Sequence, residues 1–344
     1  MSADAPARAA EAIEPGVADP DTGPGGTLAA GFRRILAARR VAGPSRIADL
    51  RADPAAARAA QKRFVALFAG APDARARVAP DRPRGRIALI RVTRRETAPG
   101  AGTAVFVHGG GFVFHDVETF LPLITRLAAE TGRTIIAPDY PKAPECDPAA
   151  LVAALVDAVE DAARAAAAAG RGPVRLIGDS VGAAVVLRAA RDRLDAMAPP
   201  LDLINPMLDL DGTRPSASHA AYGTGHLLEA GHLDWFRELT AAGFGSGFRP
   251  LDFGPADFAR LGPIALWSAA CDPLADEAGA FAEAAGAAGH PVRRVVLPAV
   301  PHDFGLFAAA VPEAEAAVGV LCAGLRDGPA AARAPSAPAE EATP

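Results

Sequence analysis

Strand-like and helix-like segments alternate along this chain, and this alternation restricts the possible folds more than any other feature of the sequence. Short apolar runs typical of buried strands occur at residues 85–94, 103–110, 134–140, 173–179, 201–208, 263–269 and 292–299. Segments typical of helices occur at 27–40, 52–70, 148–169, 274–289 and 312–326 and directly after residue 180. Because parallel strands need crossovers of helical length, we predict an α/β fold with a mostly parallel central sheet and helices on both faces.

Three regions fall outside this alternation. Residues 1–26 and 328–344 are rich in alanine and proline and lack large apolar side chains, so we expect disordered tails at both ends. Residues 211–258 form a polar, glycine-rich stretch between two strands. This connection is too long for a plain crossover, and we expect it to be an insertion over the functional site.

The charge balance and the cysteines exclude several classes of protein. The chain has 344 residues, of which 35 are basic and 40 acidic, and no basic block is interleaved with aromatic residues, which argues against nucleic-acid binding. Its three cysteines lack C-x-x-C spacing, which argues against a disulfide framework or a metal site and is typical of a cytoplasmic protein. We find no signal peptide, and no apolar run is long enough to span a membrane.

Residues 178–182 read Gly-Asp-Ser-Val-Gly and match the pattern G-x-S-x-G. In this pattern the serine lies on a sharp turn between a strand and a helix, and its hydroxyl is exposed at the end of the sheet. The apolar run before Ser180 and the helical segment after it supply that context. The pattern alone is a weak signal, because a tight turn with an unreactive serine would look the same.

A second glycine-rich stretch, His108-Gly109-Gly110-Gly111, follows the apolar run at 104–107. Such a loop leaves backbone N–H groups uncovered, as an oxyanion-binding site requires. The alternatives are a flexible turn or a phosphate-binding loop. No G-K-[ST] sequence follows and no helix begins at once, so the phosphate interpretation is poor.

Five short motifs together resemble one family. HGGGF at 108–112, DYPKAPE at 139–145, GDSVG at 178–182, CDPLADE at 271–277 and HDF at 302–304 occur in this order. The combination is similar to the hormone-sensitive-lipase-like esterases of the α/β-hydrolase superfamily, over residues 80–326. The resemblance implies an α/β-hydrolase domain at 76–327 that carries the insertion, an N-terminal helical cap at 27–75, and a homodimer.

The resemblance also implies the roles of three side chains. Ser180 would be the nucleophile, His302 its general base, and Asp272 the acid that orients the imidazole. The residues agree independently, because Asp272 and His302 each follow a predicted strand and the order serine, acid, histidine is the one that α/β-hydrolases use. Asp276 is a rival acid, but we expect it inside the next helix, facing away.

The resemblance assigns the oxyanion hole to the backbone N–H groups of Gly110, Gly111 and Val181, with His108 and Gly109 as support for the loop. Two departures from the family pattern concern specificity. The family usually has glycine after the catalytic histidine, whereas here Asp303 could raise the pKa of the imidazole or simply face solvent. Val181 can narrow the acyl side of the pocket with its branched side chain.

We therefore expect a serine carboxylic-ester hydrolase for short- to medium-chain acyl esters, which acts through an acyl-enzyme on Ser180 and needs no cofactor. The alternatives are an amidase, a lactonase or a natural-product ester hydrolase with the same triad, or a ligand-binding protein without activity. His115 is expected to contact the glycine loop. His219, His226 and His232 lie in the insertion and could line a pocket, but we expect them to be solvated. The candidates for an apolar acyl pocket are Phe32, Phe64, Phe68, Tyr222, Trp235 and Phe236.

Overall fold

The computed structural model describes residues 27–41, 47–96, 101–170, 172–214 and 216–327, so the predicted tails at 1–26 and 328–344 lie outside the described residues. Within these ranges one eight-stranded sheet has the order β1-β2-β4-β3-β5-β6-β7-β8. Its strands are β1 (Ala76–Arg84), β2 (Ile87–Arg94), β3 (Thr103–Val107), β4 (Thr134–Asp139), β5 (Val174–Asp179), β6 (Leu201–Ile204), β7 (Ile264–Cys271) and β8 (Val292–Pro301). β3 to β8 are parallel, and β2 is antiparallel to both of its neighbours. The predicted mostly parallel sheet is thus confirmed.

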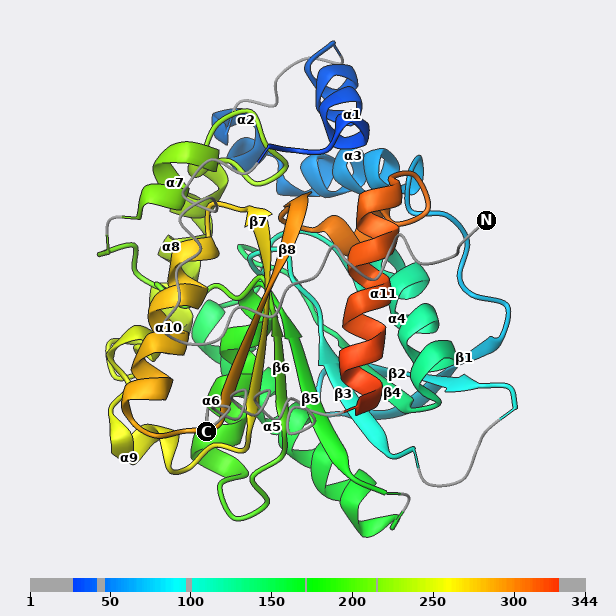
Figure 1. The fold of residues 1–344 in the computed structure, drawn as a ribbon, viewed down its shortest axis with the longest axis vertical. Coiled ribbons are helices and arrows are strands. Elements are labelled where there is room, and N and C mark those ends of the chain that lie inside the picture. The colour runs from blue at the N-terminus through cyan, green and yellow to red at the C-terminus, as the bar shows by residue number, and fades with distance from the viewer. Residues whose placement is uncertain (1–26, 42–46, 97–100, 171, 215, 328–344) are drawn as a thin grey trace, which may run out of the picture.

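Helices cover both faces of the sheet (Figure 1). One face packs against α5 (Pro148–Ala168), α6 (Val181–Arg193) and α10 (Ala275–Ala287), and the other against α4 (Val117–Thr131) and α11 (Pro312–Asp327). The middle strands β3 and β5 are buried along their whole length, which explains why both read as continuous apolar runs. Among the described residues, no helix is long and apolar enough to cross a membrane.

Helix α5 shows how local sequence sets these boundaries. Asp147 accepts a hydrogen bond from the backbone N–H of Ala150, and Pro148 occupies the first helical position. Leu151, Leu155 and other apolar residues on the same side are buried against the sheet. The helix therefore begins and ends where its capping residues predict.

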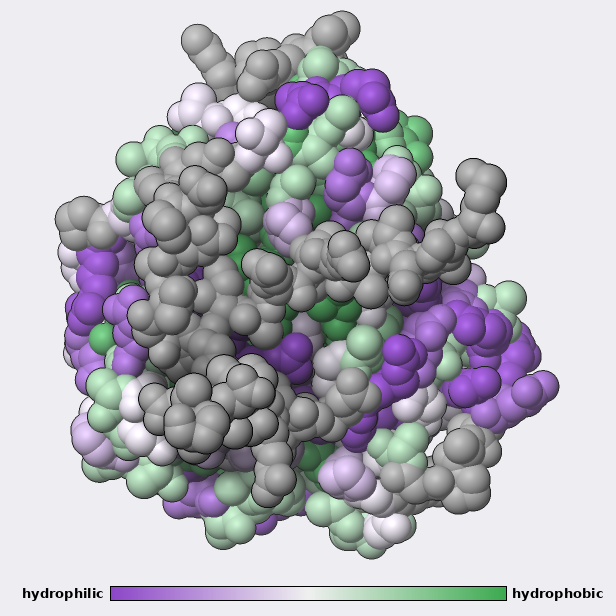
Figure 2. Space-filling view, in the orientation of Figure 1, coloured by the Kyte–Doolittle hydropathy of each residue, from purple (hydrophilic) through white to green (hydrophobic). Residues whose placement is uncertain are grey.

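Several elements were not predicted, among them an edge strand and a helix that covers one face of the sheet. β1 reads ARVAPDRPR, which is largely exposed and carries two prolines, and it pairs only with β2 at the edge of the sheet. The edge position explains why prolines are tolerated there, since half of the backbone N–H groups need no partner strand. Figure 2 shows hydrophilic side chains gathered on this side of the molecule. α4 was also missed, because Pro122 interrupts its helical pattern.

The strand expected at 201–208 is shorter than predicted. β6 ends at Ile204, because Asn205 adopts a left-handed backbone conformation with φ of 42°. Its backbone N–H instead donates to the carbonyl of Trp267 on β7.

The N-terminal helices lie at one end of the sheet, together with part of the stretch at 211–258 (Figure 1). α1 (Ala30–Val41), α2 (Ile47–Ala52) and α3 (Pro54–Ala66) lie beyond the carboxyl ends of β7 and β8, with α7 (Ala217–Tyr222) beside them (Figure 1). The stretch at 211–258 forms α7, α8 (Ala230–Phe244), a 3₁₀ turn (Pro250–Asp252) and α9 (Pro255–Phe258). α1 and α3 pack their phenylalanines onto a second 3₁₀ turn, η3 (Phe304–Phe307): the ring centroid of Phe307 lies 5.7 Å from that of Phe32 and 5.9 Å from that of Phe68.

Candidate active site

Ser180 lies at the turn between β5 and α6 with φ of 53° and ψ of −119°. This conformation is costly for a residue with a side chain, and the surrounding structure imposes it. A side chain at Gly182 would lie 2.2 Å from the carbonyl oxygen of Val107, so the helix can approach β3 only with glycine there. The backbone N–H of Ser180 donates to the carbonyl of Ile204, which fixes the turn to the end of β6.

The three side chains predicted to act together are in contact. The Nε2 of His302 lies 3.1 Å from the Oγ of Ser180, and its Nδ1 lies 2.7 Å from the Oδ2 of Asp272. All three are buried. The other oxygen of Asp272 accepts a hydrogen bond of 2.9 Å from the backbone N–H of Leu274, which holds the carboxylate in place. The rival Asp276 lies in α10 and accepts from the N–H of Ser218, away from His302.

Several acidic groups surround the imidazole. Burial alone would lower the pKa of His302, but the negative charges of Asp272 and Asp303 outweigh it and raise this pKa to about 10. Burial raises the pKa of Asp179, next to Ser180, well above its usual value. Asp272 and Asp303 contribute most of the negative charge that raises the pKa of His302, and Asp179 adds a smaller contribution.

The segment that follows β4 contacts the His108–Gly111 loop and holds it in place. The Tyr140 hydroxyl donates to the carbonyl of His108 at 3.0 Å, and the two rings stack with centroids 4.2 Å apart. Burial, with the charge of Lys142 adding to it, lowers the pKa of His108 well below its usual value, so the ring is neutral. Lys142 donates to the Tyr140 carbonyl at 2.6 Å and covers the Tyr140 ring. His108 thus contacts its own loop rather than the cavity.

The loop presents unused hydrogen-bond donors beside Ser180. Among the residues that the structure describes, the backbone N–H groups of Gly110 and Gly111 donate to no protein acceptor. Val181 is the first residue of α6, where backbone N–H groups have no partner within the helix. These three are the donors that the sequence predicted for the oxyanion hole.

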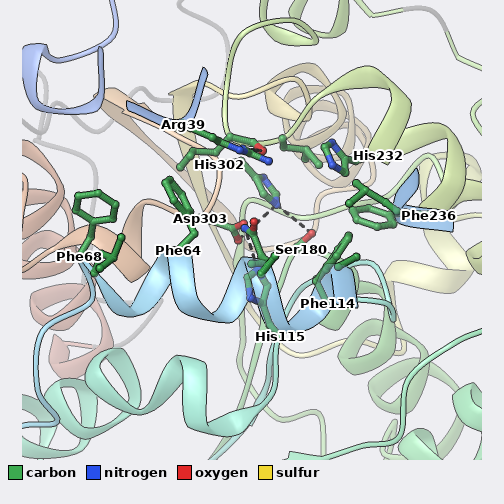
Figure 3. Close-up of a pocket in the computed structure, with 18 of the residues that line it drawn as sticks. Arg39, Phe64, Phe68, Phe114, His115, Ser180, His232, Phe236, His302 and Asp303 are labelled. Atoms are coloured by element: carbon green, nitrogen blue, oxygen red, sulfur yellow. Dashed lines mark hydrogen bonds and ion pairs between the residues drawn. The ribbon is translucent and has the colours of Figure 1, made fainter. Parts of the chain in front are cut away.

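A cavity of about 320 Å³ opens onto Ser180 and His302. Phe64 of α3 and Phe68, just after that helix, lie on one side of it, and Phe114, His232 and Phe236 lie on the other (Figure 3). Arg39 of α1, His115 and Asp303 add polar groups to a wall that is otherwise mostly apolar. The cavity is therefore enclosed by the N-terminal helices and by the insertion at 211–258, together with the glycine loop.

The pocket predictions are partly wrong. Phe64, Phe68 and Phe236 line the cavity, but Phe32, Tyr222 and Trp235 do not. Phe32 is fully buried against Phe307, and Trp235 packs against Phe114 and Arg51.

The sequence interpretation of the histidines also needs correction. His232 was expected to be solvated, but it is buried in the cavity wall because α8 turns it inward toward Phe114 and Phe236. Burial lowers its pKa to about 4, so the ring is neutral near pH 7. His115 lies beside the loop, as expected, but it also reaches Asp303 and lines the cavity. Phe114 was missed, although its place two residues after HGGGF could have drawn attention to it.

Metal binding has no support in the described part of the chain, where no group of three or more His, Cys, Asp or Glu side chains could hold an ion. The arrangement of a serine, a buried imidazole and a carboxylate beside free N–H donors suits acyl transfer.

Comparison with known proteins agrees with this geometry. Residues 104–306 match the family described as α/β hydrolase fold. The chain is 30% identical to an ethyl acetate hydrolase of Pseudomonas putida over 67% of this chain and 74% of that protein. A thermostable esterase of P. putida superposes with a TM-score of 0.77 at 24% identity, over 87% of this chain and 97% of the esterase. A hyperthermophilic esterase of Pyrobaculum calidifontis gives a TM-score of 0.75 at 25% identity, over 88% and 98%. This chain belongs to the hormone-sensitive-lipase-like esterase family of α/β hydrolases.

Proposed function

We propose that this protein hydrolyses carboxylic esters through an acyl-enzyme formed on Ser180. The observation that carries the proposal is the continuous set of contacts from Ser180 through His302 to Asp272, at 3.1 and 2.7 Å. These distances allow a proton to pass from the serine hydroxyl to the imidazole during attack. The family to which the chain belongs supports the same reaction class.

In the acylation step, the Oγ of Ser180 attacks the ester carbonyl carbon while the Nε2 of His302 takes the hydroxyl proton. Asp272 holds the imidazole in the correct tautomer and stabilises the imidazolium. The carbonyl oxygen becomes an oxyanion, and we assign its stabilisation to the N–H groups of Gly110, Gly111 and Val181. His302 then returns the proton to the alkoxy oxygen, and the alcohol leaves.

In the deacylation step, water replaces the alcohol. His302 takes a proton from the water as its oxygen attacks the acyl carbon of the ester to Ser180. The second tetrahedral intermediate uses the same three N–H donors. Its collapse returns the proton to the Oγ of Ser180 and releases the carboxylic acid, so the enzyme is restored without a cofactor.

We propose short- to medium-chain acyl esters as substrates. A cavity of about 320 Å³ holds a small or medium-sized ester, and its aromatic wall suits an alkyl chain. We propose that α1–α3 and the insertion at 211–258 act as the cap that limits chain length, because both contribute side chains to this wall. The activity named for the P. putida ethyl acetate hydrolase, on a small ester, supports this range. A profile of kcat/KM for C2 to C12 p-nitrophenyl esters tests it.

The assignment of Ser180 is tested by the variant Ser180→Ala. We expect a loss of about 10³-fold or more in kcat for p-nitrophenyl acetate, since the nucleophile is removed while binding remains. The matched control is Ser246→Ala, an exposed serine in the loop after α8, which should keep full activity. A fluorophosphonate probe should label the wild-type protein once, at Ser180.

The result of this experiment separates the alternatives. Unchanged hydrolysis by Ser180→Ala would refute the role of Ser180 as the nucleophile. A wild-type protein that neither hydrolyses the ester nor takes up the probe would refute the mechanism and favour a ligand-binding protein on this fold. An amidase or lactonase would share the labelling but would prefer an anilide or a lactone over the ester of the same acid. Assays of such matched pairs identify the bond that the enzyme cleaves.

Assembly and location are also proposals. The family resemblance supports a homodimer, and sedimentation equilibrium of the purified chain tests it. We propose a cytoplasmic location, which is supported by three cysteines without C-x-x-C spacing. Cell fractionation tests that location.

A further inference from the structure

Asp303, the residue after the candidate base, is held with its carboxylate inside the cavity. It adopts a left-handed backbone conformation, with φ of 59° and ψ of 17°. Asp303 precedes the 3₁₀ turn η3, yet its side chain makes no capping hydrogen bond to that turn. The carboxylate is instead 16% exposed and lies beside His302 (Figure 3). Of the two possibilities raised by the sequence, the side chain does not simply face solvent.

The Asp303 carboxylate lies between two imidazoles. Its Oδ1 is 3.9 Å from the Nε2 of His302, and its Oδ2 is 3.7 Å from the Nε2 of His115 (Figure 3). Among the described residues, Oδ1 is buried without a hydrogen-bond partner. His115 is itself held in a left-handed conformation, with φ of 63°. Two backbone conformations that cost free energy therefore bring this carboxylate and its partner together.

The position of Asp303 relative to the reaction follows from these distances. The Nε2 of His302 is the atom that takes the proton of Ser180 and returns it to the leaving group. Asp272 lies on the opposite nitrogen, so its carboxylate does not compete for that proton. Asp303 lies on the Nε2 side, where a negative charge at 3.9 Å stabilises a proton that the reaction has to move.

The other groups that face His302 do not replace this charge. Burial raises the pKa of Asp179 at the end of β5 well above its usual value, and Asp179 contributes less to the pKa of His302 than Asp272 and Asp303 do. His232 of α8 is neutral near pH 7 because burial lowers its pKa to about 4. Arg39 of α1 is positive, so it does not favour a proton on His302, and the side chain of His115 cannot carry a negative charge there. Asp272 and Asp303 are thus the two strongest negative influences on the imidazole.

We propose that Asp303 is a positioning residue that acts through His302: it holds the proton on Nε2 in the resting enzyme and moves the pH range of activity upward. The inference rests on the proposed function, since it assumes that His302 is the base. A family member with glycine at this position lacks the second carboxylate, so the neutral imidazole would form there at lower pH. In this chain, His302 must lose a proton held from both sides before it can accept one from Ser180.

The expected size of the effect follows from the geometry. An opposite charge within about 4 to 6 Å shifts a pKa by about 1 to 3 units. Removing the charge of Asp303 should therefore lower the apparent pKa of the rising limb in the profile of kcat/KM against pH by about one unit or more. At a pH below that limb, each unit converts into about a tenfold gain in activity, because the fraction of neutral His302 increases by that factor. The rate on the alkaline plateau should change little.

The experiment compares pH profiles of kcat/KM for p-nitrophenyl acetate in Asp303→Asn, Asp303→Gly and the wild-type protein. Asparagine keeps the shape of the side chain, and both residues tolerate the left-handed backbone. The matched control is Glu229→Gln, which removes a negative charge from the start of α8, where the side chain makes no capping hydrogen bond. We expect both Asp303 variants to lower the apparent pKa of the rising limb and Glu229→Gln to leave this pKa unchanged.

A measurement on the wild-type protein keeps the proposal testable even if neither variant folds. The rate of fluorophosphonate labelling at Ser180 depends on neutral His302, so its pH midpoint should lie well above 7. A midpoint near 6.5, the ordinary imidazole value, would overturn the proposal. Folded Asp303 variants in which the apparent pKa of the rising limb is unchanged or higher would also overturn the proposal. Failure of the proposed function looks different, since Ser180 would then not be labelled at any pH.

Discussion

Replacing Gly111 by alanine tests the oxyanion loop with a single methyl group. A Cβ atom at Gly111 would lie 2.1 Å from Cγ of the Phe236 ring, whereas carbon atoms in contact normally lie about 3.5 to 4.0 Å apart. The loop or the ring must therefore move by more than about 1 Å. The φ of 60° at Gly111 adds a cost of about 1–2 kcal/mol for a residue with a side chain.

The kinetic effect of Gly111→Ala follows from the displaced N–H group. An oxyanion hole that loses one donor costs about 10² to 10³ in kcat, because the lost hydrogen bond forms fully only in the transition state. We expect kcat for p-nitrophenyl acetate to fall by about 10²-fold or more while KM changes little. Circular dichroism and thermal unfolding would show that the variant is folded, since the change is confined to one loop.

A double-mutant cycle separates the clash from the cost of the backbone conformation. Phe236→Ala removes the ring that the new methyl group meets, but it leaves the φ of Gly111 as it was. Adding Phe236→Ala to Gly111→Ala should therefore recover part of kcat, with a coupling energy of about 1–3 kcal/mol relative to the single variants. Strictly additive effects in this cycle, or a Gly111→Ala enzyme with kcat within threefold of wild type, would refute the reasoning.

Two further predictions concern the triad and the core. Asp272→Asn should lower kcat by about 10³ to 10⁴, because the amide favours the wrong tautomer of His302; normal turnover at any pH would contradict the assigned role. Arg175→Met should lower the free energy of unfolding by about 3–5 kcal/mol in chemical denaturation, since it leaves Asp202 buried without the guanidinium that lies 2.6 Å away. Arg175→Met/Asp202→Leu should be less destabilised than Arg175→Met, and an equal or greater loss would show that the pair is not the cause.

The fold and the contact among the three candidate side chains could be predicted because their signals are local. Ser180 and Asp272 follow buried apolar strands, and His302 follows the partly buried β8. Parallel strands bring such positions to one edge of the sheet. β1 was missed because an exposed edge strand can carry prolines and charges, so it lacks the apolar alternation that identifies other strands.

The cavity wall was harder to predict, for a different reason. Which aromatic residue faces the cavity depends on how α8 and the N-terminal helices are rotated, and adjacent residues such as Trp235 and Phe236 have opposite outcomes. The direction of Asp303 likewise depends on a left-handed backbone that no residue pattern specifies. These features follow from packing between segments far apart in the chain.

The packing of Phe307 joins the N-terminal helices to the segment that carries His302. Phe307 lies five residues after His302, and Phe32, Phe64 and Phe68 of the N-terminal helices surround it with centroid distances of 5.7 to 6.3 Å. The backbone N–H of Ala29 also donates to the carbonyl of Ala299 on β8. Moving the N-terminal helices away would therefore remove these contacts from the segment that carries His302. The N-terminal helices that line the cavity at Ser180 therefore also pack against the segment that carries His302, so access to Ser180 and the position of His302 depend on the same contacts.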